Sequence, residues 1–104
     1  MYWFSIGNFQ QRGKWMIEKQ LTIINKLGLH ARATAKLIGV TSNYSSRIQL
    51  IRDGRAVDGK SIMSVMMLAA SQGTVLTVTT EGEDENEAMN AIEALINDYF
   101  GEGE

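Results

Sequence analysis

The chain has 104 residues, 44% of them hydrophobic, and a formal net charge of −2 at pH 7. This length is typical of one domain, and the hydrophobic fraction is enough for a single modest core and argues against disorder. The chain has no cysteine, which excludes disulfides, thiol catalysis and cysteine-ligated metal sites and fits a reducing, cytoplasmic setting. The weak net charge argues against nucleic acid as a partner, and no apolar run is long enough to insert into a membrane.

Charge is distributed unevenly along the chain. All ten Lys and Arg residues lie at or before Lys60, and nine of the twelve acidic residues lie after Thr80. One interpretation is that the chain ends in a polar, acidic helix. The other is that a positive face surrounds His30 and attracts an acidic partner or a phosphate.

The first fifteen residues differ from the rest, because aromatic and polar residues mix there without a sustained period. They lack the continuous apolar stretch and the small-residue cleavage site of a secretory signal. We interpret residues 1–15 as an N-terminal extension that is disordered or lies upstream of a native start at Met16, and residues 16–104 as the folded domain. The alternative is that the extension is a tail that binds a partner.

Residues 17–25 alternate apolar and polar side chains and predict a half-buried strand, which a turn over residues 26–28 follows. Residues from Ala31 to about Ser42 are predicted to form a helix, because their less polar side chains recur on one face. The side chains of that face are Thr34, Leu37, Ile38 and Thr41.

The middle of the chain predicts a hairpin. Residues 47–52 and 55–58 are predicted to be strands. The dipeptide Asp53-Gly54 between them suits a type I′ turn, because both central positions of that turn need a positive φ.

Ser61 is expected to be the N-cap of a helix over residues 62–70. Its core-facing side chains would be Val65, Leu68 and Ala69. The helix has more apolar residues than one buried stripe can hold, so some of the others must be exposed. These others are Ile62, Met63, Met66 and Met67.

Residues 75–80 predict a fourth strand by the same alternation. Residues 84–87, Asp-Glu-Asn-Glu, resemble a capping box at the start of a last helix, whose apolar residues recur with helical spacing as far as Tyr99. The tail over residues 101–104 is expected to be frayed.

The predicted order is therefore strand, helix, strand, strand, helix, strand, helix. The hairpin makes part of the sheet antiparallel, and the amphipathic helices must bury their apolar faces against it. The sequence predicts an α+β fold, a two-layer open-faced sandwich with the helices on one face of the sheet.

His30 is the only histidine, and it lies just before the first predicted helix. The unpaired N–H groups and the partial positive charge at a helix start favour a bound anion and a neutral imidazole. Both conditions suit a nucleophile that must then carry a phosphoryl group. Arg32 is close enough in sequence to reach the same anion, and Gly28 would give a partner close access.

The alternative is that His30 only caps a helix, in a non-enzymatic regulatory or small-anion-binding module. A metal site or a hydrolytic triad cannot be assembled around it, because no second histidine, nearby acid or cysteine accompanies it in the sequence. By themselves the residues predict an anion or phosphoryl site at a helix N-terminus.

Two separated motifs resemble one family. Gly28-Leu29-His30-Ala31-Arg32 is similar to the active-site signature of HPr, the histidine phosphocarrier of the bacterial phosphotransferase system, and of its nitrogen-branch relative NPr. Residues 59–68 are similar to the regulatory-serine helix of the same family. Residues 72–74 and 81–85 also match, so the likeness extends from Met16 to about Phe100. A Crh-type interaction protein, which resembles HPr but lacks the histidine, does not fit.

The resemblance implies a four-stranded antiparallel sheet, in the order 1-4-2-3, covered on one face by three helices. It implies that His30 accepts a phosphoryl group on Nδ1 from phospho-enzyme I and passes it to an enzyme IIA domain, in the sugar or the nitrogen branch. Arg32 would stabilise the phosphoryl group, and Gly28 and Ala31 would support it. The protein would be a monomeric phosphohistidine carrier rather than a turnover enzyme, with no bound cofactor or metal.

The resemblance also implies contacts with further proteins. Ser61 matches the serine that HPr kinase/phosphorylase modifies in some bacteria, and the alternative is a plain N-cap. An exposed apolar docking surface, for which partial core burial is the alternative, would consist of Leu29, Ile62, Met63 and Met66. The family often has proline directly after the arginine, whereas this chain has Ala33, which leaves a further N–H for the phosphate. Ala33 and the methionine-rich helix favour an NPr-like carrier or a carrier of an incomplete phosphotransferase system.

Overall fold

The computed structural model describes residues 8–11 and 14–104. Along the chain the elements are β1 (Asn8–Gln11), β2 (Lys14–Thr22), α1 (Ala31–Thr41), β3 (Arg47–Arg52), β4 (Arg55–Asp58), α2 (Ile62–Met66), β5 (Val75–Glu81), α3 (Glu85–Asn97) and the 3-10 helix η1 (Tyr99–Gly101). The strands and helices expected from the sequence are present in the expected order, with β1 and η1 in addition. Within the described ranges, no helix is both long enough and apolar enough to cross a membrane.

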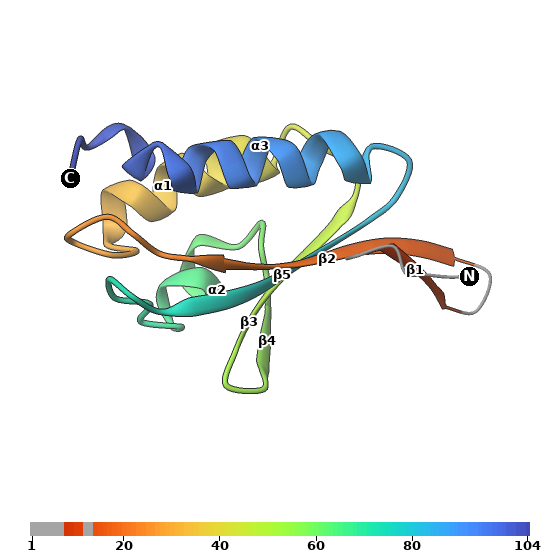
Figure 1. The fold of residues 1–104 in the computed structure, drawn as a ribbon, viewed down its shortest axis with the longest axis horizontal. Helices are drawn as coiled ribbons and strands as arrows, with labels where there is room; N and C mark the ends of the chain where they lie inside the picture. The colour runs from red at the N-terminus through yellow and green to blue at the C-terminus, as the bar shows by residue number, and fades with distance from the viewer. Residues whose placement is uncertain (1–7, 12–13) are drawn as a thin grey trace.

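The strands form one antiparallel sheet in the order β1-β2-β5-β3-β4. The four strands predicted from the sequence, β2 to β5, therefore have the order 1-4-2-3, which confirms the predicted topology. The hairpin of β3 and β4 has the predicted boundaries, and it projects from the rest of the sheet in Figure 1.

Strand β1 was not predicted. It pairs with β2 from Asn8 opposite Ile17 to Gln11 opposite Lys14, and β2 begins at Lys14 rather than at Ile17. Part of the region interpreted as an extension is thus paired with the edge of the sheet. For residues 1–7 and 12–13 that interpretation lies outside the described residues, and the expected domain start at Met16 stays a prediction.

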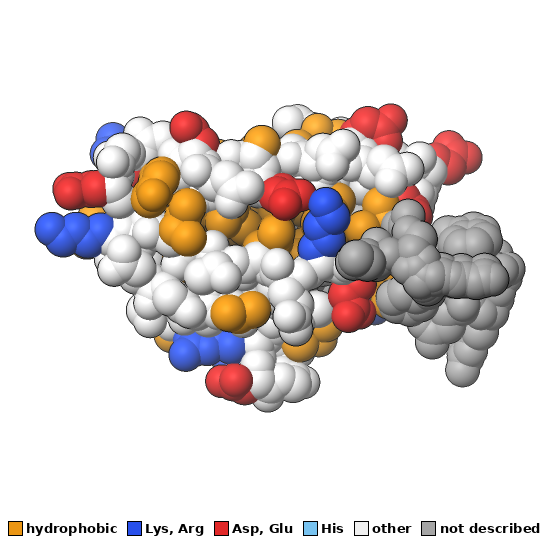
Figure 2. Space-filling view, in the orientation of Figure 1, with side chains coloured by type: hydrophobic (Ala, Val, Ile, Leu, Met, Phe, Trp, Pro, Cys, Tyr) orange, Lys and Arg blue, Asp and Glu red, His pale blue; other side chains and the backbone are white. Residues whose placement is uncertain are grey.

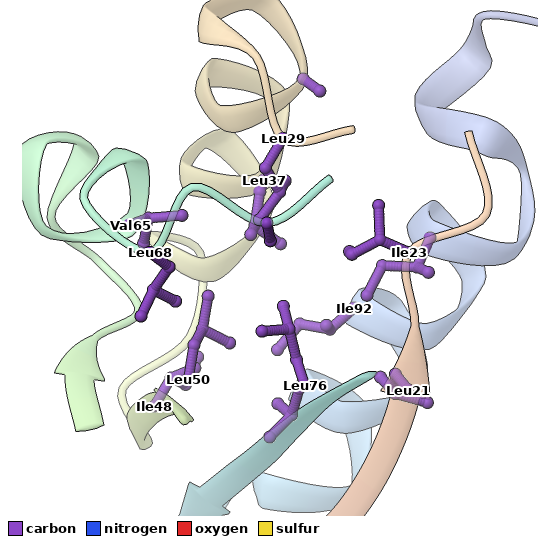
Figure 3. Packing of buried hydrophobic residues seen from close by; sticks show 14 of the residues in the cluster. Leu21, Ile23, Leu29, Leu37, Ile48, Leu50, Val65, Leu68, Leu76 and Ile92 are labelled. Carbon is purple, nitrogen blue, oxygen red and sulfur yellow. The ribbon is translucent and has the colours of Figure 1, made fainter. Parts of the chain in front are cut away.

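One face of the sheet packs against all three helices. The buried cluster includes Leu50 from β3 and Leu76 from β5, and each helix contributes to it through Leu37, Val65 and Ile92. Figure 3 shows side chains from the strands and the helices pointing into the same space. Because every helix buries residues in one cluster, the helices lie on the same face of the sheet, as predicted.

Helix α2 is shorter than predicted, because it ends at Met66 and not at Ala70. The guanidinium of Arg52 donates to the carbonyl oxygens of Leu68 and Ala69, both at 2.7 Å, and holds these residues in a turn. Within this turn the φ of Ala69 is 51°. The prediction that Ala69 faces the core is therefore wrong: Ala69 is exposed and Ala70 is buried in its place.

Helix α3 does not begin with the predicted capping box. Asp84 is the N-cap residue, but its side chain makes no capping hydrogen bond. Its carboxylate contacts the hydroxyl of Ser46 and accepts the backbone N–H groups of Ser45 and Ser46, at 2.8 and 3.0 Å. These hydrogen bonds, above all the one from the Ser46 hydroxyl, lower the pKa of Asp84 to about 2. Asp84 thus ties the start of α3 to the chain just before β3.

The C-terminal tail folds back over the domain, so the prediction that it is frayed is wrong. Phe100 is fully buried, and its carbonyl oxygen accepts a hydrogen bond from Nζ of Lys36 at 2.7 Å. The backbone N–H of Lys26 donates to the carbonyl oxygen of Glu104 at 3.0 Å. The C-terminus consequently lies beside the loop before α1, as Figure 1 shows.

The replacement Asp84→Asn is expected to lower the free energy of unfolding at pH 7, because the amide puts an N–H group against the donors that now face a carboxylate. The pKa of Asp84 is depressed in the folded state, so its contribution is present above the ordinary value of 3.8 and is lost as the pH falls toward about 2. Urea unfolding of wild type and variant between pH 7 and pH 2 should show the difference narrowing in that range.

Glu83→Gln is the matched control, because Glu83 is the exposed acid directly before Asp84. Its unfolding free energy should follow that of the wild type. A deficit of Asp84→Asn that is as large at pH 2 as at pH 7 would contradict the assignment.

Candidate phosphoryl-transfer site

The loop between β2 and α1 turns sharply at Gly28. This residue has a φ of +69°, and its N–H donates to the carbonyl oxygen of Asn25 at 3.2 Å. A Cβ on Gly28 would lie 2.6 Å from the carbonyl oxygen of Ala70 and 2.8 Å from Cα of Ser71. The loop can therefore pack directly against the turn that follows α2 only because residue 28 has no side chain.

His30 is the N-cap residue of α1, as predicted, with φ −73° and ψ 176°. Its carbonyl oxygen accepts the N–H of Thr34 at 2.9 Å. The N–H groups of residues 31–33 lie before this hydrogen bond, in the first turn, where the helix itself provides no acceptor for them. The His30 side chain makes no capping hydrogen bond. The alternative in which His30 only caps the helix is therefore wrong for its side chain.

The imidazole of His30 instead contacts the C-terminal tail. Its Nε2 contacts Oε2 of Glu102, and the other oxygen of that carboxylate, Oε1, accepts a hydrogen bond from Nδ2 of Asn25 at 3.0 Å. The side chains of His30 and Glu102 are 29% and 15% exposed. The hydrogen bond from Asn25 holds the pKa of Glu102 below its usual range, and the contact with His30 and the charge of Lys36 act in the same direction.

The sequence did not reveal Glu102 or Asn25 as site residues. Asn25 is separated from Glu102 by 77 positions, and the tail was predicted to be frayed. The one local signal was Phe100, a large apolar residue at the end of the last helical pattern, whose burial brings Glu102 into place.

A hollow of about 260 Å³ lies beside His30. Its lining consists of Lys26, Leu27, His30, Arg32, Glu102 and Glu104. The cations expected around His30 are present, but two carboxylates from the C-terminal tail accompany them. The face around His30 that was interpreted as positive therefore has mixed charge, because the acidic end of the chain returns to the site.

The predicted docking residues are only partly at the surface. Leu29 is 6% exposed and belongs to the core, so its expected place on an exposed surface is wrong. On α2 the side chains are exposed, with fractions of 43% for Ile62, 72% for Met63 and 40% for Met66. Leu27, two residues earlier in the same loop, is 68% exposed and lines the hollow beside His30.

Hydrophobic side chains also reach the surface on the face drawn in Figure 2, where they gather along the boundary between the helix layer and the sheet. The exposed apolar residues of the chain are therefore not restricted to α2. Exposure alone does not mark a binding surface, so position beside His30 is the stronger criterion.

Ser61 is the N-cap of α2, and its Oγ accepts the N–H of Ser64 at 3.3 Å. The capping role predicted for this residue is confirmed. Among the residues that the structure describes, no group of three His, Cys, Asp or Glu side chains is arranged to hold a metal ion.

Three comparisons with known proteins agree with this geometry. A family model described as "PTS HPr component phosphorylation site" matches residues 17–98. The chain is 57% identical over 89 residues to the phosphocarrier protein HPr of Cupriavidus necator, which covers 86% of this chain and 100% of that protein. It is 58% identical over 86 residues to the phosphocarrier protein HPr of Pseudomonas aeruginosa, with 82% of this chain and 96% of that protein covered.

The fold has counterparts among solved structures. The crystal structure of HPr-C-His from Thermoanaerobacter tengcongensis superposes with a TM-score of 0.80 and is 45% identical in sequence, over 82% of this chain and 96% of that one. The structural match thus covers most of the chain, and the residues matched by the family model, 17–98, include the start of α1 and all of α2.

Gly28→Ala is expected to lower the free energy of unfolding by about 2 kcal/mol or more, because the left-handed conformation costs a non-glycine residue about 1–2 kcal/mol and the new methyl group meets backbone atoms. Gly39→Ala in α1 is the control. Nothing lies within 4 Å of a Cβ added there. Alanine is favoured over glycine inside a helix by about 1 kcal/mol, so this variant should be slightly more stable than the wild type.

Urea unfolding followed by circular dichroism measures both variants. A Gly28→Ala protein as stable as the wild type would show that the loop before His30 has room for a side chain, contrary to the packing described above.

Proposed function

The chain belongs to the HPr family of phosphocarrier proteins of the phosphotransferase system, and we propose that His30 is the residue that carries its phosphoryl group. This proposal rests on the position of His30 in the fold. It is the only histidine of the chain, it stands at the start of α1, and its partly exposed ring lines a hollow that contains cationic side chains.

The proposed reaction is an in-line transfer between histidines. The Nδ1 lone pair of His30 attacks the phosphorus on the phosphohistidine of enzyme I, a new N–P bond forms, and the electron pair of the old N–P bond stays on the donor nitrogen. The same exchange then passes the group from His30 to a histidine of an enzyme IIA domain. The chain acts as a substrate-like carrier, in the cytosol and as a monomer, and needs no cofactor of its own.

Arg32 and the first turn of α1 would hold the transferred group. Arg32 lines the hollow beside His30, and its guanidinium can form two parallel hydrogen bonds to a phosphoryl group. The first-turn N–H groups, which include that of Ala31, point toward the helix start and favour an anion there. Gly28 supports the site by letting the loop lie close to the turn after α2.

We place partner docking on exposed apolar side chains next to the site. These are Ile62, Met63 and Met66 of α2, together with Leu27. Methionine side chains adapt to surfaces of different shape, which suits a carrier that must contact a donor and an acceptor in turn.

Ser61 is the proposed position of regulatory phosphorylation by an HPr kinase/phosphorylase. The residue is half-buried, and its Oγ already accepts the N–H of Ser64. A phosphoryl group there would put negative charge at the start of α2, next to the apolar docking side chains of that helix.

Incubation with enzyme I, Mg²⁺ and radioactive phosphoenolpyruvate tests the role of His30. The wild type should acquire a phosphate that is labile in acid and stable in base, and His30→Ala should acquire none. Arg32→Ala should be labelled about tenfold more slowly, because one charge-assisted contact to the phosphoryl group is lost. Ser61→Ala is the control and should be labelled like the wild type.

Labelling of His30→Ala would overturn the assignment of the acceptor residue. Retained wild-type rates in Arg32→Ala would remove Arg32 from the site without affecting His30.

A further inference from the structure

The last six residues, 99–104, form a hook that closes on the loop before α1. Tyr99 and Phe100 have φ values of 58° and 53°, which reverse the chain direction after α3. The buried ring of Phe100 anchors the hook in the core, and Lys36 and Lys26 bind its backbone at 2.7 and 3.0 Å. The hook therefore has a defined position relative to His30.

Asn25 fixes the carboxylate that the hook brings to the site. Its side chain is completely buried, and its Nδ2 donates to the carbonyl oxygen of Gly28 at 2.9 Å and to Oε1 of Glu102 at 3.0 Å. Both partners can only accept hydrogen bonds, so the amide must present its nitrogen to them. One oxygen of Glu102 is thereby held, and the other is directed at Nε2 of His30.

This contact determines where the imidazole carries its proton. The hydrogen bond from Asn25 keeps the pKa of Glu102 below its usual range, so the group is an ionised carboxylate near neutral pH. An ionised carboxylate has no hydrogen to donate, and Nε2 must therefore be the protonated nitrogen. In the neutral ring this leaves the lone pair on Nδ1.

We propose that Glu102 is a positioning residue for phosphoryl transfer, which holds the ring of His30 with Nε2–H toward its carboxylate and Nδ1 ready to attack. The inference rests on the proposed role of His30 and adds a second residue to it. When the Nδ1–P bond forms, the donor nitrogen keeps the electron pair of the broken bond, and the proton stays on Nε2. The ring becomes positively charged, and the Glu102 carboxylate stabilises that charge.

A surface ion pair that forms by chance would not need this construction. Exposed pairs contribute little and involve two mobile side chains. Here the carboxylate is 15% exposed, a fully buried amide holds one of its oxygens, and two lysines bind the backbone around it. The geometry is thus imposed on His30 by the fold.

The first test uses the unphosphorylated protein. With ¹⁵N-labelled histidine, NMR should show a slowly exchanging Nε2–H signal for His30 in the wild type, and Glu102→Ala should lose it. Asp98→Asn is the matched control, because Asp98 is an exposed acid directly before the hook and does not line the hollow. It should keep the signal.

The second test measures the kinetics of phosphorylation by enzyme I. Glu102→Gln keeps the shape of the side chain but removes its charge, and kcat should fall about tenfold, the size expected for one charge-assisted hydrogen bond, while KM for the carrier stays unchanged. Asp98→Asn should keep the wild-type kcat. The backbone amide NMR spectrum of each variant shows whether its fold is retained. If Glu102→Ala unfolds, Glu102→Gln is used in its place.

A Glu102→Ala protein that keeps both the Nε2–H signal and the wild-type kcat would overturn the proposal. Equal loss of kcat in Glu102→Gln and Asp98→Asn would overturn it as well, because loss of any negative charge near the C-terminus would then explain the effect. Failure of the wild type to be phosphorylated on His30 would instead contradict the proposed function, and the NMR result would still decide whether Glu102 holds the ring.

Discussion

The buried amide of Asn25 joins the two parts of the chain from which the site is built. It donates to the carbonyl of Gly28 in the loop before α1 and to the carboxylate of Glu102 in the C-terminal hook. Its own oxygen is buried without a hydrogen-bond partner among the described residues, a situation that costs about 1–3 kcal/mol. An apolar residue would remove that cost but leave two acceptors without a donor, and the ring of His30 would lose its support.

The hook shows a similar balance of costs and gains. Left-handed backbone at Tyr99 and Phe100 costs about 1–2 kcal/mol per residue, and complete burial of the phenylalanine side chain contributes roughly 1.5–3 kcal/mol. The hook brings two carboxylates to a hollow that also contains Lys26 and Arg32.

Local sequence signals predicted most of the fold. The hairpin of β3 and β4 was correct to the residue, because the Asp53-Gly54 turn and the alternation of side chains act over a few positions. The position of His30 at the start of α1 was correct for the same reason. The predictions failed where a side chain that is distant in sequence replaced a local contact. Arg52 binds the carbonyl oxygens of the turn that follows α2, and that helix ends earlier than predicted. Ser45 and Ser46, which precede β3, bind the carboxylate of Asp84 in place of the first turn of α3.

Local sequence patterns predicted the order of the elements, the antiparallel hairpin, and a single histidine at a helix start with Arg32 two residues later. The family resemblance implied the strand order of the whole sheet. The burial of Leu29, the exposure of Leu27 and the contact between Glu102 and His30 became visible only in the folded chain. Separation along the chain explains why local patterns could not reveal the contact with Glu102. Asn25 and Glu102 are 77 positions apart, and no periodic pattern relates them, so they meet only after the packing of α3 and Phe100 has fixed the path of the tail.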